Sequence, residues 1–293
     1  MARLAGDERT YRIALCRRLR LHDGDPCPTC DKPLGKWGMP PRKTVEHKIL
    51  VATEHGEDWV SISTVAGIID KGGALSGWAF NTAVEGFVEL VATGWKVEGL
   101  SVEQVKEALK KAGATPWVKK DRAAERGTQV HEEVLEALGT GVDPEQVKQT
   151  VLELPDDVRG YGVGAFRWYE DEAPVPILVE EPVWSAKHRT SGTLDLFAAR
   201  KDGRNVLTDL KTSKAVYESH PVQLDGYGLC INELIDEGIL DIPRPRAHSI
   251  VLSRPDGTYE EKFLPSDPGA FLNALELTKA VMKVRALLKE EAA

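Results

Sequence analysis

The sequence predicts an α/β or α+β fold with a helical elaboration in its N-terminal half, and three observations support this class. The chain has 293 residues and is 42% hydrophobic, which supplies enough apolar surface for one large core or two small ones. Its apolar spacing follows the order helices, strands, helix, strands, helix. Turn formers at 201–205 separate two runs rich in Leu, Val, Phe and Thr, a pattern typical of a β-hairpin.

Helical periodicity dominates the N-terminal half. A basic amphipathic pattern comes first, and the third helix is expected to start at Ser101, where Gln104 completes a capping box. A stretch rich in Lys and Arg precedes the fourth. The predicted helices of this half cover residues 10–21, 75–91, 101–111 and 127–138.

The C-terminal half mixes strands with helices. A strand over 177–184 precedes the two strands of the hairpin, and we expect these three neighbours to form an antiparallel meander. A second hairpin is predicted around Pro255-Asp256-Gly257, with strands over 247–253 and 258–264. The predicted helices cover residues 143–154, 158–169, 217–234 and 268–289. We therefore divide the chain into a basic N-terminal segment (1–58), a helical elaboration (59–116) and a core (117–293).

The charge of the chain is unevenly distributed. The net charge of −8 argues mildly against a protein that coats nucleic acid, whereas a nuclease needs only a local basic path. Up to Lys48 there are eleven Lys and Arg against six Asp and Glu, a net +5. No run approaches the roughly 18 apolar residues of a membrane span, and residues 1–21 carry arginines throughout instead of an apolar leader. We expect a soluble, cytoplasmic protein without a membrane partner.

The four cysteines are too unevenly placed for a secreted disulfide framework. Cys27 and Cys30 form a Cys-X-X-Cys in a turn-rich loop, which has the shape of half a zinc knuckle. The remaining ligands would have to come from Cys16, His22 or His47, and none of these has the spacing of a zinc finger. Structural Zn²⁺ and a redox-active or free thiol pair both remain open, with an iron–sulfur cluster least favoured.

The hairpin carries the candidate chemistry. Because side chains alternate along a strand, Asp209 and Lys211 should share one face while Leu210 turns to the other. Asp195 lies on the neighbouring strand, so two carboxylates and an ammonium would hold a divalent metal and a water together. The simpler interpretation is a surface hairpin with scattered charges.

Two helices would flank this hairpin with polar groups. His131 shares a helix face with apolar residues three and four positions away, so it should point inward, either as a hydrogen-bonded core residue or as a metal ligand. Gln223 and Tyr227 are four residues apart on the helix after the hairpin and should project from one face.

These residues occur in the order and approximate spacing of a known family. The chain resembles the RecB-like branch of the PD-(D/E)XK nucleases, and within it the phage recombination exonucleases more than the CRISPR-associated exonucleases. The resemblance covers roughly residues 126–230 and implies a restriction-endonuclease-like core with a central mixed sheet flanked by helices. It rests on His131 after Arg126-Gly127, Glu181, Gly192-Thr193-Leu194-Asp195, Asp209-Leu210-Lys211-Thr212 and Gln223-Leu224-Asp225-Gly226-Tyr227.

The resemblance implies a role for each matched residue. Mg²⁺, or Mn²⁺, would be bound by His131, Asp195, Asp209 and the backbone carbonyl of Leu210. Lys211 would orient and activate the attacking water. Further contributions to the site are implied for Gln223 and Tyr227, which would help to hold Lys211 and the DNA strand, and for Glu181, although the neighbouring Glu180 would fit the same acidic position.

The chain also departs from part of the family. RecB-like nucleases with an iron–sulfur cluster have one cysteine ahead of the core and three behind it, whereas here three lie ahead and only Cys230 lies behind. This argues against a cluster and favours a phage-type exonuclease with its own N-terminal zinc loop. The sequence contains no Gly-rich phosphate loop of a helicase.

The resemblance predicts a metal-dependent DNA exonuclease that acts on DNA ends, in the host cytoplasm if a phage encodes it. Its partners would be linear duplex or single-stranded DNA and a single-strand annealing protein, and homo-oligomers occur among phage exonucleases. Two alternatives remain open: an endonuclease or a CRISPR-adaptation-like end trimmer on the same core, and a non-catalytic DNA-binding module. Intact Asp195, Asp209 and Lys211 argue against the last.

Overall fold

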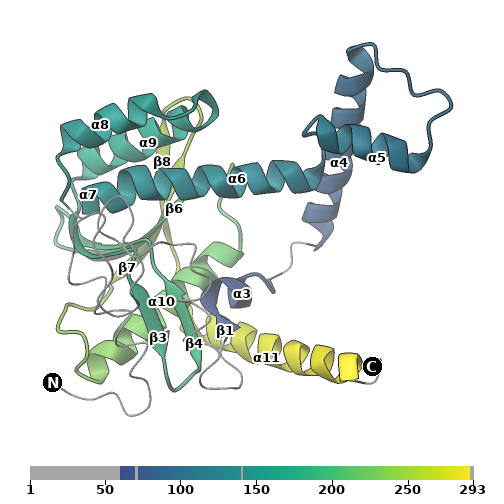
Figure 1. The fold of residues 1–293 in the computed structure, drawn as a ribbon. Helices are drawn as coiled ribbons and strands as arrows, with labels where there is room; N and C mark the ends of the chain where they lie inside the picture. The colour runs from purple at the N-terminus through teal and green to yellow at the C-terminus, as the bar shows by residue number, and fades with distance from the viewer. Residues whose placement is uncertain (1–59, 70–71, 140, 291–293) are drawn as a thin grey trace, which may run out of the picture. The chain divides into compact units, whose positions relative to one another are not determined.

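The computed structural model describes residues 60–69, 72–139 and 141–290 (Figure 1). The predicted basic helix over 10–21 and the Cys27–Cys30 loop lie outside these residues. The chain divides into two compact units, of which unit 2 covers Asp70–Gln129 and unit 1 the remainder. The boundaries expected from the sequence were 59 and 117. The first boundary lies later in the chain because residues 60–69 pair and pack with the strands and helices of unit 1. The second lies later because the helix that begins at Pro116 continues to Val130.

Unit 2 is helical, as the sequence predicts. It contains α4 (Gly72–Ala92), α5 (Val102–Lys111) and nearly all of α6 (Pro116–Val130). The predicted capping box is present, since Ser101 Oγ accepts from the Gln104 N–H at 3.3 Å and Gln104 Oε1 accepts from the Ser101 N–H at 2.8 Å. These bonds satisfy amide groups at the start of α5 that have no partner within the helix.

Unit 1 is built around a five-stranded mixed sheet with the strand order β2-β5-β6-β7-β8. The β6 and β7 strands run parallel and every other neighbouring pair is antiparallel, so both predicted hairpins are confirmed. The helix α10 (Ser219–Asp236) makes the crossover between the two parallel strands. The strands are β2 (Val175–Val179), β5 (Leu196–Ala199), β6 (Asn205–Lys211), β7 (Ala247–Ser253) and β8 (Tyr259–Leu264).

A second, three-stranded sheet has the order β1-β4-β3, with β1 (Val60–Ser61), β4 (Thr190–Thr193) and β3 (Pro182–Ser185). The single strand predicted over 177–184 is therefore wrong. Glu180 has φ +47°, a left-handed conformation that ends β2 and turns the chain into the other sheet. Asp195, expected on the first strand of the hairpin, lies just outside it, since β4 ends at Thr193 and the hairpin strand β5 begins at Leu196.

Helices cover both faces of the five-stranded sheet, which confirms a mixed α/β fold. Alternate strand residues divide between two apolar clusters: Phe197 and Leu207 pack with α10, whereas Leu196 and Leu210 pack with α8 and α9. Figure 1 shows α8 and α9 on one side of the sheet and α10 on the other. The helices on the α8 side are a π-helical turn η1 (His131–Glu136), α7 (Ala137–Gly139), α8 (Pro144–Glu153) and α9 (Asp156–Glu172).

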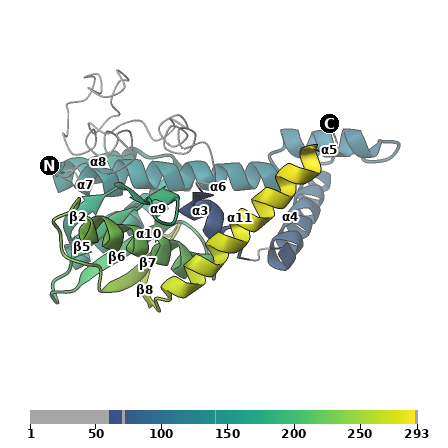
Figure 2. The ribbon, with the colours of Figure 1, turned by 90° about the horizontal axis from the view of Figure 1, so that it is seen from below.

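The first core cluster is completed by two further helices, the short α3 (Ile62–Ala66) and the long α11 (Pro268–Glu290). Figure 2 follows α11 from its start beside β8 to the C-terminus. The predicted helices of the C-terminal half are all found within a few residues of their expected bounds. Among the helices that the structure describes, none is both long and apolar enough to cross a lipid bilayer.

Candidate metal and catalytic site

The end of β6 carries the charged pair that the sequence places on one face. Lys211 Nζ donates to Asp209 Oδ1 at 2.9 Å and lies 2.7 Å from Oδ2. The Leu210 side chain turns to the opposite apolar cluster, as strand alternation predicts. Asp209 is 1% exposed, so its carboxylate is removed from water and depends on cations for stabilisation.

The backbone of Leu210 has no neighbouring strand on the β5 side. The β5 strand begins at Leu196, which pairs with Thr208, so the ladder stops two residues before Leu210. The Leu210 N–H instead donates to Asp195 Oδ2 at 2.8 Å, and the Leu210 carbonyl faces His131 Nε2 at 2.8 Å. Two side chains thus take the place of a strand, and this is why Asp195 and His131 meet at one point of β6.

Two chain corners hold the carboxylates of Glu180 and Asp195 together. The first corner joins β2 to β3 at Glu180 and Glu181, and the second joins β4 to β5 at Leu194 and Asp195. The corners bond to each other, since the Glu180 N–H donates to the Asp195 carbonyl at 2.8 Å and the Leu194 N–H to the Glu181 carbonyl at 3.1 Å. The change of sheet that the sequence did not predict is therefore what builds the site.

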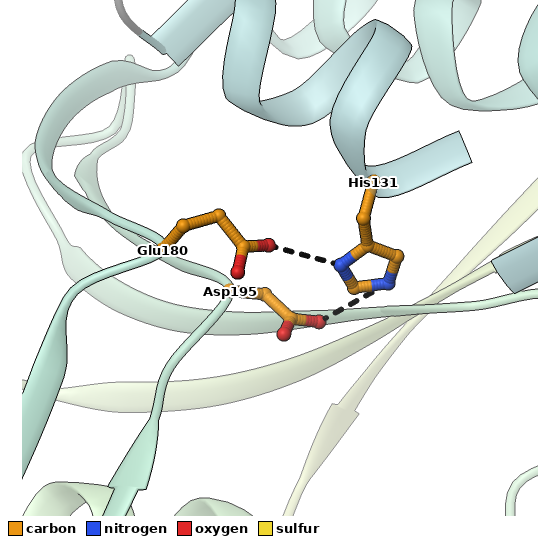
Figure 3. Close-up of side chains that lie close together, drawn as sticks. All are labelled: His131, Glu180 and Asp195. Carbon is orange, nitrogen blue, oxygen red and sulfur yellow. Dashed lines mark hydrogen bonds and ion pairs between the residues drawn. The ribbon is translucent and has the colours of Figure 1, made fainter. Parts of the chain in front are cut away.

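The imidazole of His131 contacts both carboxylates, one through each ring nitrogen (Figure 3). Its Nδ1 is 3.0 Å from Glu180 Oε1, and its Nε2 is 3.6 Å from Asp195 Oδ2. The residue begins the π-helical turn η1, a widened turn that is frequent at functional sites because it redirects side chains. His131 faces inward as predicted, and both of its ring nitrogens face oxygen acceptors.

The donor set of this group fits a divalent cation. Neutral imidazole carries one N–H, so a ring facing acceptors at both nitrogens needs a second proton or a cation in its place. His131 Nε2 lies 2.8 Å from the Leu210 carbonyl oxygen and 3.6 Å from Asp195 Oδ2. Adjacent octahedral ligands about 2.05 Å from Mg²⁺ would lie about 2.9 Å apart. Ligand atoms of His131, Glu180 and Asp195 lie within 4.8 Å of one another.

Glu180 contacts the nitrogen of His131 that faces away from Leu210. A carboxylate on the distal nitrogen fixes the orientation of a ligating histidine and raises its basicity. Of the two adjacent acids that fit the sequence pattern, Glu180 makes this contact, whereas Glu181 is buried beside it and lies outside the three-residue group. The sequence left both Glu181 and Glu180 open for this position, and the contact with His131 favours Glu180.

Burial and mutual charge shift the pKa values of this group. The pKa of Asp195 is raised to about 7, chiefly by burial; His131 and Lys211 oppose the rise, and the charges of Asp209 and Glu180 add to it. Burial alone would lower the pKa of Lys211, but the carboxylates of Asp209 and Asp195 outweigh it and the net shift is upward. Lys211 is therefore an ammonium in the absence of metal.

The helix α10 contributes Tyr227 and Gln223 from one face, as predicted, and Gln223 Nε2 donates to the Tyr227 hydroxyl at 3.0 Å. The pKa of Tyr227 is raised well above its ordinary value, first by burial and then by the charges of Asp195 and Asp209. The phenol therefore stays protonated beside the two carboxylates.

From the sequence, Gly192 is only part of a motif and has no assigned role, yet the residue positions Tyr227. A Cβ at residue 192 would lie 2.7 Å from Tyr227 Cε1 and 3.2 Å from the Ile62 side chain. Only glycine lets the tyrosine ring lie against β4. A glycine inside a strand is the sequence signal for such a close approach.

Comparison with known proteins adds no family assignment. No protein-family model matches this chain, and no protein of curated function shows significant similarity to it.

Proposed function

We propose that the protein is a Mg²⁺-dependent deoxyribonuclease that acts as an exonuclease at DNA ends, with a restriction-endonuclease-like core in the sheet-containing unit, residues 130–293. One observation carries the proposal: His131 Nε2, the Leu210 carbonyl and the Asp195 carboxylate converge beside the Asp209–Lys211 pair. This combines a site for a hard cation with a partly buried amine next to it. The order of these residues in the sequence resembles that of the RecB-like nucleases.

The donor atoms define which residues would hold the metal. His131 Nε2, Asp195, Asp209 and the Leu210 carbonyl would bind Mg²⁺ or Mn²⁺, and Glu180 would orient His131 through Nδ1. The bound metal supplies a polarised water and neutralises charge on the phosphate that is attacked. Nitrogen and oxygen donors of this kind also suit other divalent ions, so activity should be compared among Mg²⁺, Mn²⁺ and other divalent metals.

Lys211 would take part in proton transfer, and Asp209 fixes the position of its amine. Its ammonium is bound by Asp209, and its charge is favoured by two carboxylates against the effect of burial. A cation that shares those carboxylates removes this support, and burial then favours the neutral amine. The amine nitrogen would accept the proton of the attacking water, while Gln223 and Tyr227 would help to hold Lys211 and the DNA strand.

An end-labelled linear duplex tests this function and its nearest alternative. We expect mononucleotides or short products from linear DNA with Mg²⁺, no digestion of a covalently closed circle, and release that depends on which end carries the label. Cleavage of the closed circle would support the endonuclease alternative instead. Binding without cleavage of either DNA, with Mg²⁺ or Mn²⁺, would support the non-catalytic DNA-binding module.

We separately propose, from the sequence alone, that Cys27 and Cys30 bind a structural zinc ion. Metal analysis of purified protein should find about one Zn²⁺ per chain, and less in Cys27→Ser. Zinc-free wild-type protein of full activity would contradict it and leave a redox-active or free thiol pair.

A further inference from the structure

An exposed aromatic ring lies on the connection between β6 and α10, the segment that follows Lys211. Tyr217 is 46% exposed. Its ring meets the ring of His220 edge to face, with centroids 5.4 Å apart and planes at 78°. The Tyr217 N–H donates to His220 Nδ1 at 3.3 Å, and the His220 N–H donates to the Tyr217 carbonyl at 2.9 Å. The tyrosine is thus supported by a buried histidine while much of its surface faces solvent.

The connection that carries Tyr217 is fixed before any ligand binds. Arg254 Nη1 donates to the Lys214 carbonyl at 2.6 Å and to the Ser213 carbonyl at 3.4 Å. Val216 packs against the first core cluster. An aromatic ring held this way loses little conformational entropy when a ligand stacks on it.

His220, which contacts the Tyr217 ring, lies on the same face of α10 as Tyr227 beside the metal group. His220, Gln223 and Tyr227 are spaced by three and four residues, so they lie along one face of the helix. Tyr227 lies beside the carboxylates of the site, and the seven residues back to His220 span about 10 Å at 1.5 Å per residue. This axial rise between His220 and Tyr227 corresponds to about three stacked base steps of about 3.4 Å.

From this placement we propose that Tyr217 is a stacking platform for a base of the DNA strand being cut, within about three nucleotides of the scissile phosphate. The inference rests on the proposed nuclease function and deepens it. A base inside a duplex is covered on both faces by its neighbours, so a protein ring reaches only an unpaired base or the last base of an end. The strand held by Tyr217 is therefore unpaired or frayed, and stacking tolerates any base sequence.

Steady-state digestion of a single-stranded oligonucleotide tests the role of the ring. Removing one base-stacking contact should raise KM about 5- to 150-fold in Tyr217→Ala. We expect kcat to stay within about twofold of wild type, and Tyr217→Phe, which keeps the ring, to retain the wild-type KM. Phe263→Ala is the matched control, because Phe263 is 47% exposed on the edge strand β8.

A second readout locates the stacked base. Oligonucleotides with 2-aminopurine at successive positions from the end are bound without divalent metal, so that no cleavage occurs. We expect fluorescence to change on binding at a position near the cut, with the change lost in Tyr217→Ala and kept in Tyr217→Phe.

The possible failures are distinguishable. Hydrolysis by Tyr217→Ala with wild-type KM and an unaltered fluorescence pattern would overturn the stacking role while the nuclease function stands. A wild-type protein that hydrolyses no DNA with Mg²⁺ or Mn²⁺ would overturn the nuclease function itself.

Discussion

Asp195→Asn should stabilise the metal-free protein at alkaline pH, although it removes a candidate metal ligand. The carboxyl of Asp195 has a pKa of about 7 in the folded chain against an ordinary value of 3.8, chiefly because it is buried. The amide of asparagine is neutral at every pH. It can still accept the hydrogen bond from the Leu210 N–H that Asp195 Oδ2 now accepts at 2.8 Å.

The sign and size of the effect follow from linkage between protonation and folding. A folded-state pKa above the unfolded value contributes stability that is full below about pH 4 and is lost as the pH rises through 7. The shift from 3.8 to about 7 corresponds to at most about 4 kcal/mol at 1.36 kcal/mol per pKa unit. Asp195→Asn should therefore be more stable than wild type by about 1–4 kcal/mol at pH 8, and the difference should disappear near pH 4.

Denaturant unfolding of both proteins with EDTA at pH 8 and pH 4, and then with Mg²⁺ at pH 8, measures this effect. Mg²⁺ should stabilise wild type more than Asp195→Asn, because the variant lacks the carboxylate. Asp202→Asn, in the exposed turn of the same hairpin, is the matched control. A metal-free Asp195→Asn that is less stable than wild type at pH 8 would refute the argument that burial of this charge costs more than His131, Lys211 and the Leu210 N–H return.

Three further substitutions test the parts of the site. Lys211→Ala should lower the single-turnover rate constant about 10²- to 10⁴-fold at saturating Mg²⁺, and a smaller loss would contradict the role of Lys211 in proton transfer. Gly192→Ala places a Cβ 2.7 Å from the Tyr227 ring, so unfolding should show a loss of about 1–3 kcal/mol and digestion should slow; unchanged values would mean that the ring moves freely. Glu180→Gln should weaken Mg²⁺ binding about 10- to 100-fold by calorimetry, more than Glu181→Gln, and the reverse order would return the role to Glu181.

The local patterns of the sequence predict most elements of the fold. The capping box at Ser101, the hairpin turn at 201–205 and the period of α10 are set by neighbouring residues, and all three are found. The division of the predicted strand at Glu180 was missed. A left-handed glutamate has no local signature, since glycine or asparagine is the usual choice for that conformation.

The candidate site was predictable in composition more than in arrangement. Strand alternation correctly places Asp209 and Lys211 on one face, and helix periodicity correctly turns His131 inward. Neither pattern reveals that β5 stops short of Leu210, because that depends on pairing between segments distant in sequence. The contact between Glu180 and His131 depends on the same change of sheet.

The most direct test of the central claim is Mg²⁺-dependent digestion of an end-labelled linear duplex by wild type, Asp209→Ala and Asp202→Ala. Asp209 is buried beside Lys211, whereas Asp202 is an exposed carboxylate in the turn of the same hairpin. We predict that wild type and Asp202→Ala degrade the DNA and that Asp209→Ala, with an unchanged circular dichroism spectrum, does not. Digestion by Asp209→Ala at the wild-type rate would contradict the assignment of this site.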